Sequence, residues 1–167
     1  MRQRQIDRML LGISAGCFLL MSISFLIMPV ESIAILSGLL FWLGLAFGIS
    51  LQIVLEVRRR AFFRSYGAKW KKMQKPRNGL CSFGSNPAAK ITDYVMPVSF
   101  VAMVVTVVLT KGYGYVCNVA LAVTIFSFCM HCILNGRIYF HAKNQLKIRQ
   151  ALESKKEDTF RKGEGKK

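Results

Sequence analysis

Four long apolar stretches that contain no Asp, Glu, Lys or Arg alternate with polar segments along this chain. The stretches are Met9–Val30, Ser32–Leu55, Tyr94–Thr110 and Gly112–Gly136. Each is close to the roughly 20 residues that a helix needs to cross a bilayer. Hydrocarbon offers no partner for an open strand edge, whereas a helix satisfies its own backbone groups. The pattern therefore predicts an all-α integral membrane protein with four transmembrane helices.

The third stretch is the shortest. Its 17 residues span about 26 Å as a helix, slightly less than a hydrocarbon core of about 30 Å. We therefore expect Lys90 and Asp93 to lie at the membrane interface. Asn86 before Pro87 is a suitable N-cap for a helix that begins just ahead of this stretch. Pro97 is expected to kink that helix.

The basic residues are sorted along the chain, and their distribution predicts its orientation. The 24 Lys and Arg residues contribute to a formal net charge of +16. Three precede the first stretch, ten lie between Arg58 and Lys90, ten follow from Arg137 onward, and the two other connections carry only Lys111. Basic segments stay on the cytoplasmic side of a membrane. The expected arrangement is two helical hairpins with both termini and the loop 57–92 in the cytoplasm. A bacterial plasma membrane is the expected location, judged from the compactness of the chain.

Little of the chain is left outside the membrane, so residues 1–141 are expected to form a single four-helix transmembrane domain. Residues 142–167 follow as a basic cytoplasmic tail, helical to about Glu153 and disordered from Lys155 onward. The first stretch, at 22 residues, is longer than the roughly 7 to 15 residues of a signal-peptide core. The run Ser14-Ala15-Gly16-Cys17 has Ser where a lipoprotein box has Leu. A retained anchor is therefore expected.

After Leu55 the sequence predicts a basic amphipathic helix that turns along the membrane surface. Its apolar face would consist of Phe62, Phe63, Tyr66, Trp70 and Met73. Aromatic residues at headgroup depth beside cations are typical of an interfacial helix. The residues expected to contact anionic lipid are Arg58, Arg59, Arg60, Arg64, Lys69, Trp70, Lys71 and Lys72. Unspecific attraction, at about 1 kcal/mol per near-surface cation, explains the same charges, and no nucleic-acid partner is expected.

A polar cluster near the cytoplasmic end of the fourth stretch is the main candidate site. It consists of His131, Asn135, Arg137 and His141. On one helix His131 and Asn135 share a face, as do Arg137 and His141. With Cys129 and Cys132 nearby, the cluster could bind a soft metal or a lipid phosphate. One helix presents few ligands at one point, however, so hydrogen bonds to neighbouring helices are the favoured interpretation. No metal, cofactor or catalytic residue is assigned.

Two glycine motifs and the cysteines are read as packing features. Gly12 with Gly16, and Gly44 with Gly48, each form a G-x-x-x-G pattern that permits close helix approach within the first hairpin or in an oligomer. The cysteines are Cys17, Cys117, Cys129 and Cys132 in the apolar stretches and Cys81 in the basic loop. This placement does not indicate an extracellular disulfide framework.

No motif identifies a substrate or a reaction, so function is inferred by elimination. The favoured hypothesis is a non-enzymatic accessory or interaction subunit of a larger membrane system, because charge at the membrane midplane and a convincing catalytic constellation are both missing. An oligomeric small transporter or channel is the alternative. Its polar line would consist of Ser14, Ser22, Ser24, Ser50 and Gln52. A membrane enzyme at the cytoplasmic face is a second alternative. It would use His131, Arg137 and His141 with Asp93 or Glu56.

Overall fold

The computed structural model describes residues 2–66, 86–110 and 114–164 of the chain. Its elements are α1 (Arg2–Ile27), η1 (Glu31–Ile33), α2 (Ala34–Ser65), η3 (Pro87–Ala89), α4 (Lys90–Thr110), α5 (Tyr115–Asn135) and α6 (Arg137–Glu164). Four helical segments are long and apolar enough to cross a membrane: Gln3–Ile27, Ala34–Ser65, Pro87–Thr110 and Tyr115–Ser154. Across the described residues, the prediction of an all-helical protein with four candidate membrane spans is confirmed.

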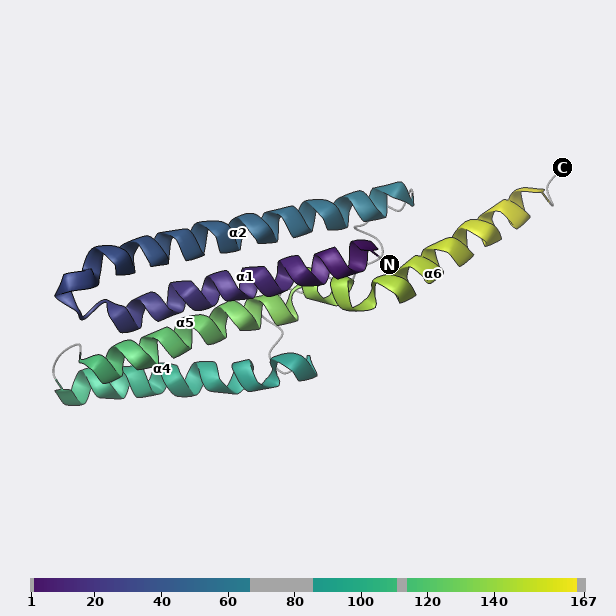
Figure 1. The fold of residues 1–167 in the computed structure, drawn as a ribbon. Helices are drawn as coiled ribbons and strands as arrows, with labels where there is room; N and C mark the ends of the chain where they lie inside the picture. The colour runs from purple at the N-terminus through teal and green to yellow at the C-terminus, as the bar shows by residue number, and fades with distance from the viewer. Residues whose placement is uncertain (1, 67–85, 111–113, 165–167) are drawn as a thin grey trace.

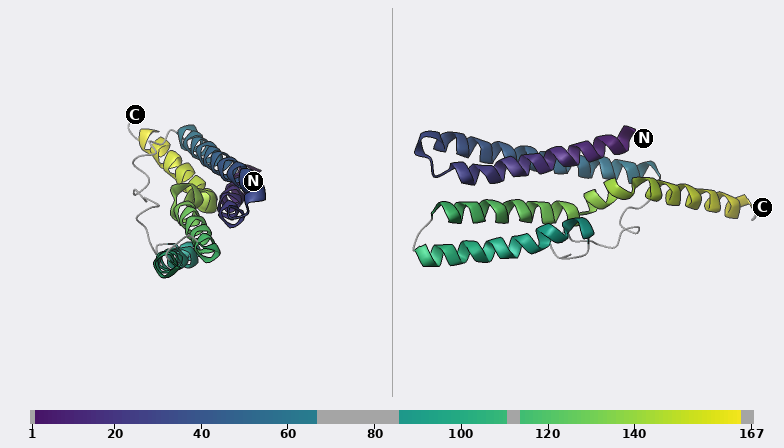
Figure 2. Two further views of the ribbon diagram at one scale, coloured as in Figure 1. Left: turned by 90° about the vertical axis from the view of Figure 1, so that its left-hand side faces the viewer. Right: turned by 60° about the horizontal axis from the view of Figure 1, so that its bottom comes forward.

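The four long apolar helices lie side by side in the order α2, α1, α5, α4 (Figure 1). Helix α2 packs along α1, helix α4 packs along α5, and the two pairs meet where α1 contacts α5. In the turned views α4 stays beside α5 and α1 overlaps α2, while α6 extends beyond the end of α5 (Figure 2). Helices α1 and α5 therefore form the middle of the molecule, and α2 and α4 its two edges.

The apolar core lies where the middle helices meet. Phe18 and Met21 of α1 pack against Ile133 of α5, and all three side chains are at least nine-tenths buried. Phe41 and Leu45 of α2 pack against this core from the other side of α1. The core is small because most large apolar side chains point outward, as expected for helices surrounded by lipid.

Several helix boundaries differ from the predicted ones for local reasons. Helix α1 ends at Ile27 rather than Val30, because Pro29 cannot continue a helix. The chain enters η3 as predicted, with Pro87 in its first turn and the Asn86 side chain accepting a hydrogen bond from the backbone amide of Ala88 at 3.1 Å. Helix α4 contains Pro97, and the kink expected there remains a prediction.

The basic segment after Leu55 does not begin a separate interfacial helix. Residues 57–65 continue α2 without a break, so the chain stays helical after Leu55 as predicted, and its turn along the membrane surface remains a prediction. These residues are compatible with a continuous helix because none of them is Gly or Pro. Residues 67–85, with Trp70 and Met73 of the predicted apolar face and Cys81, lie outside the described residues.

The sequence predicts one helix through His131 and His141. This prediction is wrong, because the helix breaks at Gly136. This glycine has φ −74° and ψ 159°, so α5 ends at Asn135 and α6 starts in a new direction. A Cβ atom at Gly136 would lie 2.8 Å from the Cys132 carbonyl oxygen. The tight turn therefore requires glycine.

Helix α6 runs to Glu164, past the end expected near Glu153. The segment from Lys155 onward that the sequence predicts to be disordered is therefore helical up to that point. The Lys, Arg and Glu residues of this segment favour helix, and its weakest helix former, Gly163, lies close to its end.

Helices α1 and α2 approach closely at two glycines of α2. A Cβ atom at Gly44 would lie 2.6 Å from the Cys17 carbonyl oxygen and 2.8 Å from the Met21 backbone nitrogen. A Cβ atom at Gly48 would lie 2.9 Å from the ring of Phe18. Only hydrogen fits at Gly44, where the close atoms belong to the α1 backbone, whereas at Gly48 the Phe18 ring would have to move. The second glycine motif therefore lies in the seam of the α1–α2 pair.

The first glycine motif is placed differently. A Cβ atom at Gly12 or Gly16 would have no heavy atom within 4 Å beyond the local helix backbone. Both glycines are exposed on the same face of α1 as Met9 and Ile13. The sequence was compatible with either motif in the seam between α1 and α2. Of the two, only Gly44 and Gly48 lie in it.

We expect Gly44→Leu to destabilise the protein by about 1–3 kcal/mol or more, because backbone atoms of α1 occupy the space and cannot rotate away. Gly16→Leu is the matched control, since it gains the same helix propensity in an open position. Reversible unfolding in mixed micelles with increasing dodecyl sulfate measures both. Equal stability of the two variants would contradict the seam.

Candidate functional site

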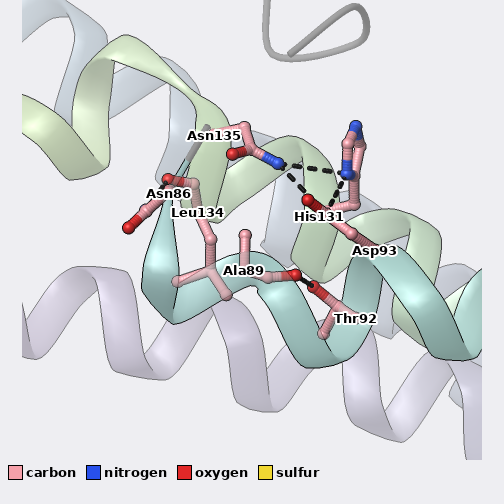
Figure 3. A network of polar contacts seen from close by, with 7 residues as sticks. All are labelled: Asn86, Ala89, Thr92, Asp93, His131, Leu134 and Asn135. Carbon is pink, nitrogen blue, oxygen red and sulfur yellow. Dashed lines mark hydrogen bonds and ion pairs between the residues drawn. The ribbon is translucent and has the colours of Figure 1, made fainter. Parts of the chain in front are cut away.

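The segment that leads into α4 contacts the last turn of α5. The Asn86 amide nitrogen donates a hydrogen bond to the Leu134 carbonyl oxygen at 2.6 Å, while the Asn86 side-chain oxygen caps η3. Thr92 donates to the Ala89 carbonyl oxygen at 2.8 Å in the next turn (Figure 3). This start places Asp93, one turn into α4, against the polar end of α5.

Asp93, His131 and Asn135 form a buried polar group between α4 and α5, here called the Asp93 cluster (Figure 3). Their side chains belong to residues that are 6%, 1% and 3% exposed, respectively. The Nδ1 atom of His131 lies 2.5 Å from Oδ1 of Asp93, and the amide nitrogen of Asn135 lies 3.3 Å from the same oxygen. One carboxylate oxygen therefore joins two side chains of the neighbouring helix.

The geometry indicates where the protons of the Asp93 cluster lie. The short distance to the carboxylate indicates that Nδ1 of His131 is protonated and donates to Asp93. Asn135 then donates to the same oxygen. The 3.0 Å separation of its nitrogen from Nδ1 reflects two donors that converge on one acceptor. A carboxylate held in this way orients the imidazole ring and its tautomer.

A buried charge inside a membrane protein is expensive unless it is paired, and pairing makes the contact between the helices specific. Breaking a buried ion pair by removing one partner costs about 3–5 kcal/mol in soluble proteins. The Asp93 cluster therefore determines how α4 sits on α5. A pocket of about 220 Å³ beside it is lined by Asn135, Asn86 and Tyr139, but not by Asp93 or His131.

Further polar contacts join neighbouring helices. Thr124 of α5 donates a hydrogen bond to the Ser99 hydroxyl of α4 at 2.9 Å. Ser14 of α1 donates to the Gly48 carbonyl oxygen at 3.2 Å and accepts from the Gln52 amide at 2.9 Å. Each contact satisfies a polar group that lipid cannot, and each adds to the packing of one helix pair.

The remaining hydroxyls of the proposed polar line mostly bond within their own helix. Ser22 donates to the Phe18 carbonyl oxygen at 2.9 Å and Ser24 to the Met21 carbonyl oxygen at 2.6 Å, whereas Ser50 is exposed on α2. Ser residues in membrane helices often bond to their own backbone in this way. The residues of the line therefore do not converge on one path.

The polar cluster predicted from the sequence is divided by the break at Gly136. His131 and Asn135 come together as predicted, whereas His141 lies on α6 and packs against the rings of Phe62 and Phe63, with ring centroids 4.9 and 5.5 Å away. His141 is 3% exposed, and neither ring nitrogen has a hydrogen-bond partner. Arg137 is the first residue of α6.

Three of the arginines expected to bind anionic lipid are engaged by carboxylates. Arg58 pairs with Asp7 of α1 at 2.7 Å, and Arg59 and Arg60 pair with Glu56 at 2.7 and 2.9 Å. Arg59 is only 2% exposed, so it belongs to the interior of the α1–α2–α6 junction. Arg64 is exposed. Lys69, Trp70, Lys71 and Lys72 lie outside the described residues.

The sequence could have revealed Asp93 as the partner of His131, although it suggested Asp93 only as one of two candidates. Asp93 lies just before the third apolar stretch, and His131 lies about five residues before the end of the fourth. In an antiparallel pair these positions fall at similar depth. Within the described part of the chain, no group of three His, Cys, Asp or Glu side chains is placed to hold a metal ion.

Comparison with known proteins finds no matching family model, curated protein or solved structure.

A double-mutant cycle tests whether the Asp93 cluster joins α4 to α5. We expect Asp93→Ala and His131→Ala to be coupled by about 1–2 kcal/mol in the free energy of unfolding, because each removes the partner of the other. Thr106→Ala is the control partner for His131→Ala. The Thr106 hydroxyl bonds to the Ala102 carbonyl oxygen of its own helix at 2.8 Å, so its coupling should be close to zero. Equal couplings would contradict the assignment.

Proposed function

We infer that this chain is a non-enzymatic multi-pass membrane protein that acts as an accessory or interaction subunit of a larger membrane system. The observation that carries this proposal is the open face of α1 around Gly12 and Gly16. Although α1 is one of the two middle helices, no heavy atom of another described helix lies within 4 Å of a Cβ atom built at Gly12 or Gly16, and Met9, Ile13 and Leu20 beside them are exposed. This face is defined here as Met9, Gly12, Ile13, Gly16 and Leu20, and is called the α1 open face.

A small-xxx-small pattern on an exposed helix face favours a second helix over lipid. Lipid chains adapt to any side chain, whereas a helix gains close backbone contact only across small residues. Gly44 and Gly48 illustrate this within the chain, because the same spacing lets α2 approach the α1 backbone. The α1 open face has the same spacing and lacks an occupant among the described residues, which supports an intermolecular role.

The arrangement of polar groups favours an interaction subunit over a transporter or an enzyme. The Asp93 cluster and the contacts Ser99–Thr124 and Ser14–Gln52 are each used to join a pair of helices. A proton or ion path needs polar groups that face a common water-filled space. The reactive side chains suggested for an enzyme are divided between the Asp93 cluster and the separate site of His141.

The proposed orientation follows from the basic residues. Both ends of the described chain, together with the C-terminal part of α2, carry the positive charges, whereas the turns after α1 and α4 carry few. We therefore place both termini in the cytoplasm, and a bacterial plasma membrane remains the proposed location. General attraction to anionic lipid accompanies this topology.

Cysteine accessibility tests the orientation. In a chain whose native cysteines are replaced by Ser or Ala, Ser32→Cys in η1 should react with an impermeant maleimide added to intact cells, because the turn between α1 and α2 faces outward. Ser154→Cys in α6 should react only after permeabilisation. The opposite pattern would show that the hairpins are inverted.

Extraction from native membranes into lipid nanodiscs tests the interaction role. We expect a second protein at constant stoichiometry, and we expect Gly12→Leu with Gly16→Leu to abolish its recovery, because Leu side chains hold a second helix away from the α1 backbone. Gly38→Leu is the matched control, since Gly38 of α2 is equally open.

Each other outcome of the extraction favours a different function. A complex containing only copies of this chain, lost in the Gly12/Gly16 variant, would favour an oligomeric transporter or channel over an accessory subunit. A monomer without partner in native membranes would contradict both and leave the enzyme hypothesis, which Asp93→Ala and His131→Ala would then test. Equal loss of the partner in Gly38→Leu would show that the α1 open face is not the contact.

A further inference from the structure

A pocket of about 460 Å³ lies where the start of α1, the end of α2 and the middle of α6 come together. These three segments meet at the same end of the molecule, next to the N-terminus (Figure 1). Phe62 and Leu146 supply apolar parts of its wall, and Arg4, Arg8 and Arg149 supply charge. We call it the α1–α6 pocket.

The α1–α6 pocket carries charge of one sign. Of the residues that line it in the described chain, three are arginines and none is Asp or Glu. Two carboxylates lie nearby: Asp7 pairs with Arg58, which does not line the pocket, whereas Glu153 accepts from Nε of Arg149 at 2.9 Å and offsets part of the positive charge of the lining. The lining therefore favours an anion, and the planar forks of Arg side chains suit phosphate oxygens in particular.

Two buried polar atoms of the lining residues have no hydrogen-bond partner among the residues that the structure describes. They are Nε of Arg4, a donor, and Oε1 of Gln145, an acceptor, and Gln145 is only 7% exposed. A buried polar atom without a partner is unfavourable unless a ligand or water satisfies it. A phosphodiester group alone would satisfy Nε of Arg4, because its oxygens accept hydrogen bonds and it has no hydrogen to donate. The glutamine oxygen needs a ligand that also donates a hydrogen bond.

The position of the α1–α6 pocket indicates where such a ligand comes from. Arg4 and Arg8 directly precede the apolar run of α1 that begins at Met9. The cations thus lie at the depth of lipid headgroups if α1 spans the membrane, while Phe62 and Leu146 provide apolar contact. These residues differ from Arg58, Arg59 and Arg60, whose guanidinium groups are paired with carboxylates.

We propose that the α1–α6 pocket binds one phosphodiester that also carries a free hydroxyl, namely the headgroup of an anionic glycerophospholipid of the phosphatidylglycerol type. Arg4, Arg8 and Arg149 hold the phosphate. Gln145 accepts a hydrogen bond from the headgroup hydroxyl. The bound lipid then joins α6 to α1 at the membrane surface.

The test uses the full chain, delipidated in a non-ionic detergent and titrated with short-chain lipids by native mass spectrometry. We expect one saturable phosphatidylglycerol per chain and much weaker binding of phosphatidylcholine, which lacks net charge. Arg4→Gln with Arg149→Gln should lower the affinity about tenfold or more. Arg64→Gln with Lys147→Gln removes the same charge from exposed positions that do not line the pocket, and should change it less than about threefold.

Gln145→Leu separates hydroxyl recognition from charge. It should weaken phosphatidylglycerol binding and leave the binding of phosphatidylethanol, a phosphodiester whose headgroup has no hydroxyl, unchanged. The soluble headgroup, glycerophosphoglycerol, distinguishes lipid from a free phosphate ester, and binding as tight as that of the lipid would replace the lipid with a soluble ligand. Equal loss of affinity in both charge variants, or binding that never saturates, would overturn the pocket as a site.

A second measurement avoids the risk that a variant misfolds. A photoreactive phosphatidylglycerol analogue is crosslinked to the unmodified chain, and the adducts are mapped by peptide mass spectrometry. We expect adducts in residues 3–8 and 145–149, competed by unlabelled phosphatidylglycerol and not by phosphatidylcholine. Adducts confined to other segments would contradict the assignment.

Discussion

A polar side chain within a membrane must find its hydrogen-bond partner inside the protein, and the relative positions of these helices depend on that constraint. Asp93 and His131 would each be costly alone in hydrocarbon, so they occupy facing positions on α4 and α5. Asn135 adds a second donor to the same oxygen. Because no apolar surface drives helices together in lipid, such contacts and close backbone packing supply the specificity.

The two helix pairs meet this constraint in different ways. Helices α4 and α5 are joined by polar side chains, with the Asp93 cluster at one level and Ser99–Thr124 at another. Helices α1 and α2 combine backbone proximity at Gly44 and Gly48 with polar contacts such as Ser14–Gln52 and Arg58–Asp7. Between the pairs lies the small apolar core of α1 and α5. The molecule is a row of four helices, and Gly12 and Gly16 on one face of α1 remain exposed.

The basic end of the molecule illustrates why the number of charges says little about binding. The arginines from Arg58 to Arg60 attract attention in the sequence, yet they pair with Asp7 and Glu56. Arg4 and Arg149, far apart along the chain, line a common pocket beside the buried Gln145. Folding thus brings Arg4, Arg8 and Arg149 to one pocket, although Arg149 also pairs with Glu153. The lipid contacts proposed from the structure therefore differ from those predicted from the sequence.

The sequence by itself determined the class of the protein and its candidate spans, because apolar length and the backbone's need for hydrogen bonds are local properties. It also placed the start of η3, since the Asn86 cap and Pro87 act within one turn. Only the tertiary structure decided which of two identical glycine motifs packs, and that Asp93 is the partner of His131. It also showed that Gly136 separates His141 from that pair. These features depend on contacts between residues distant in sequence, and local patterns do not specify which surfaces of two helices meet.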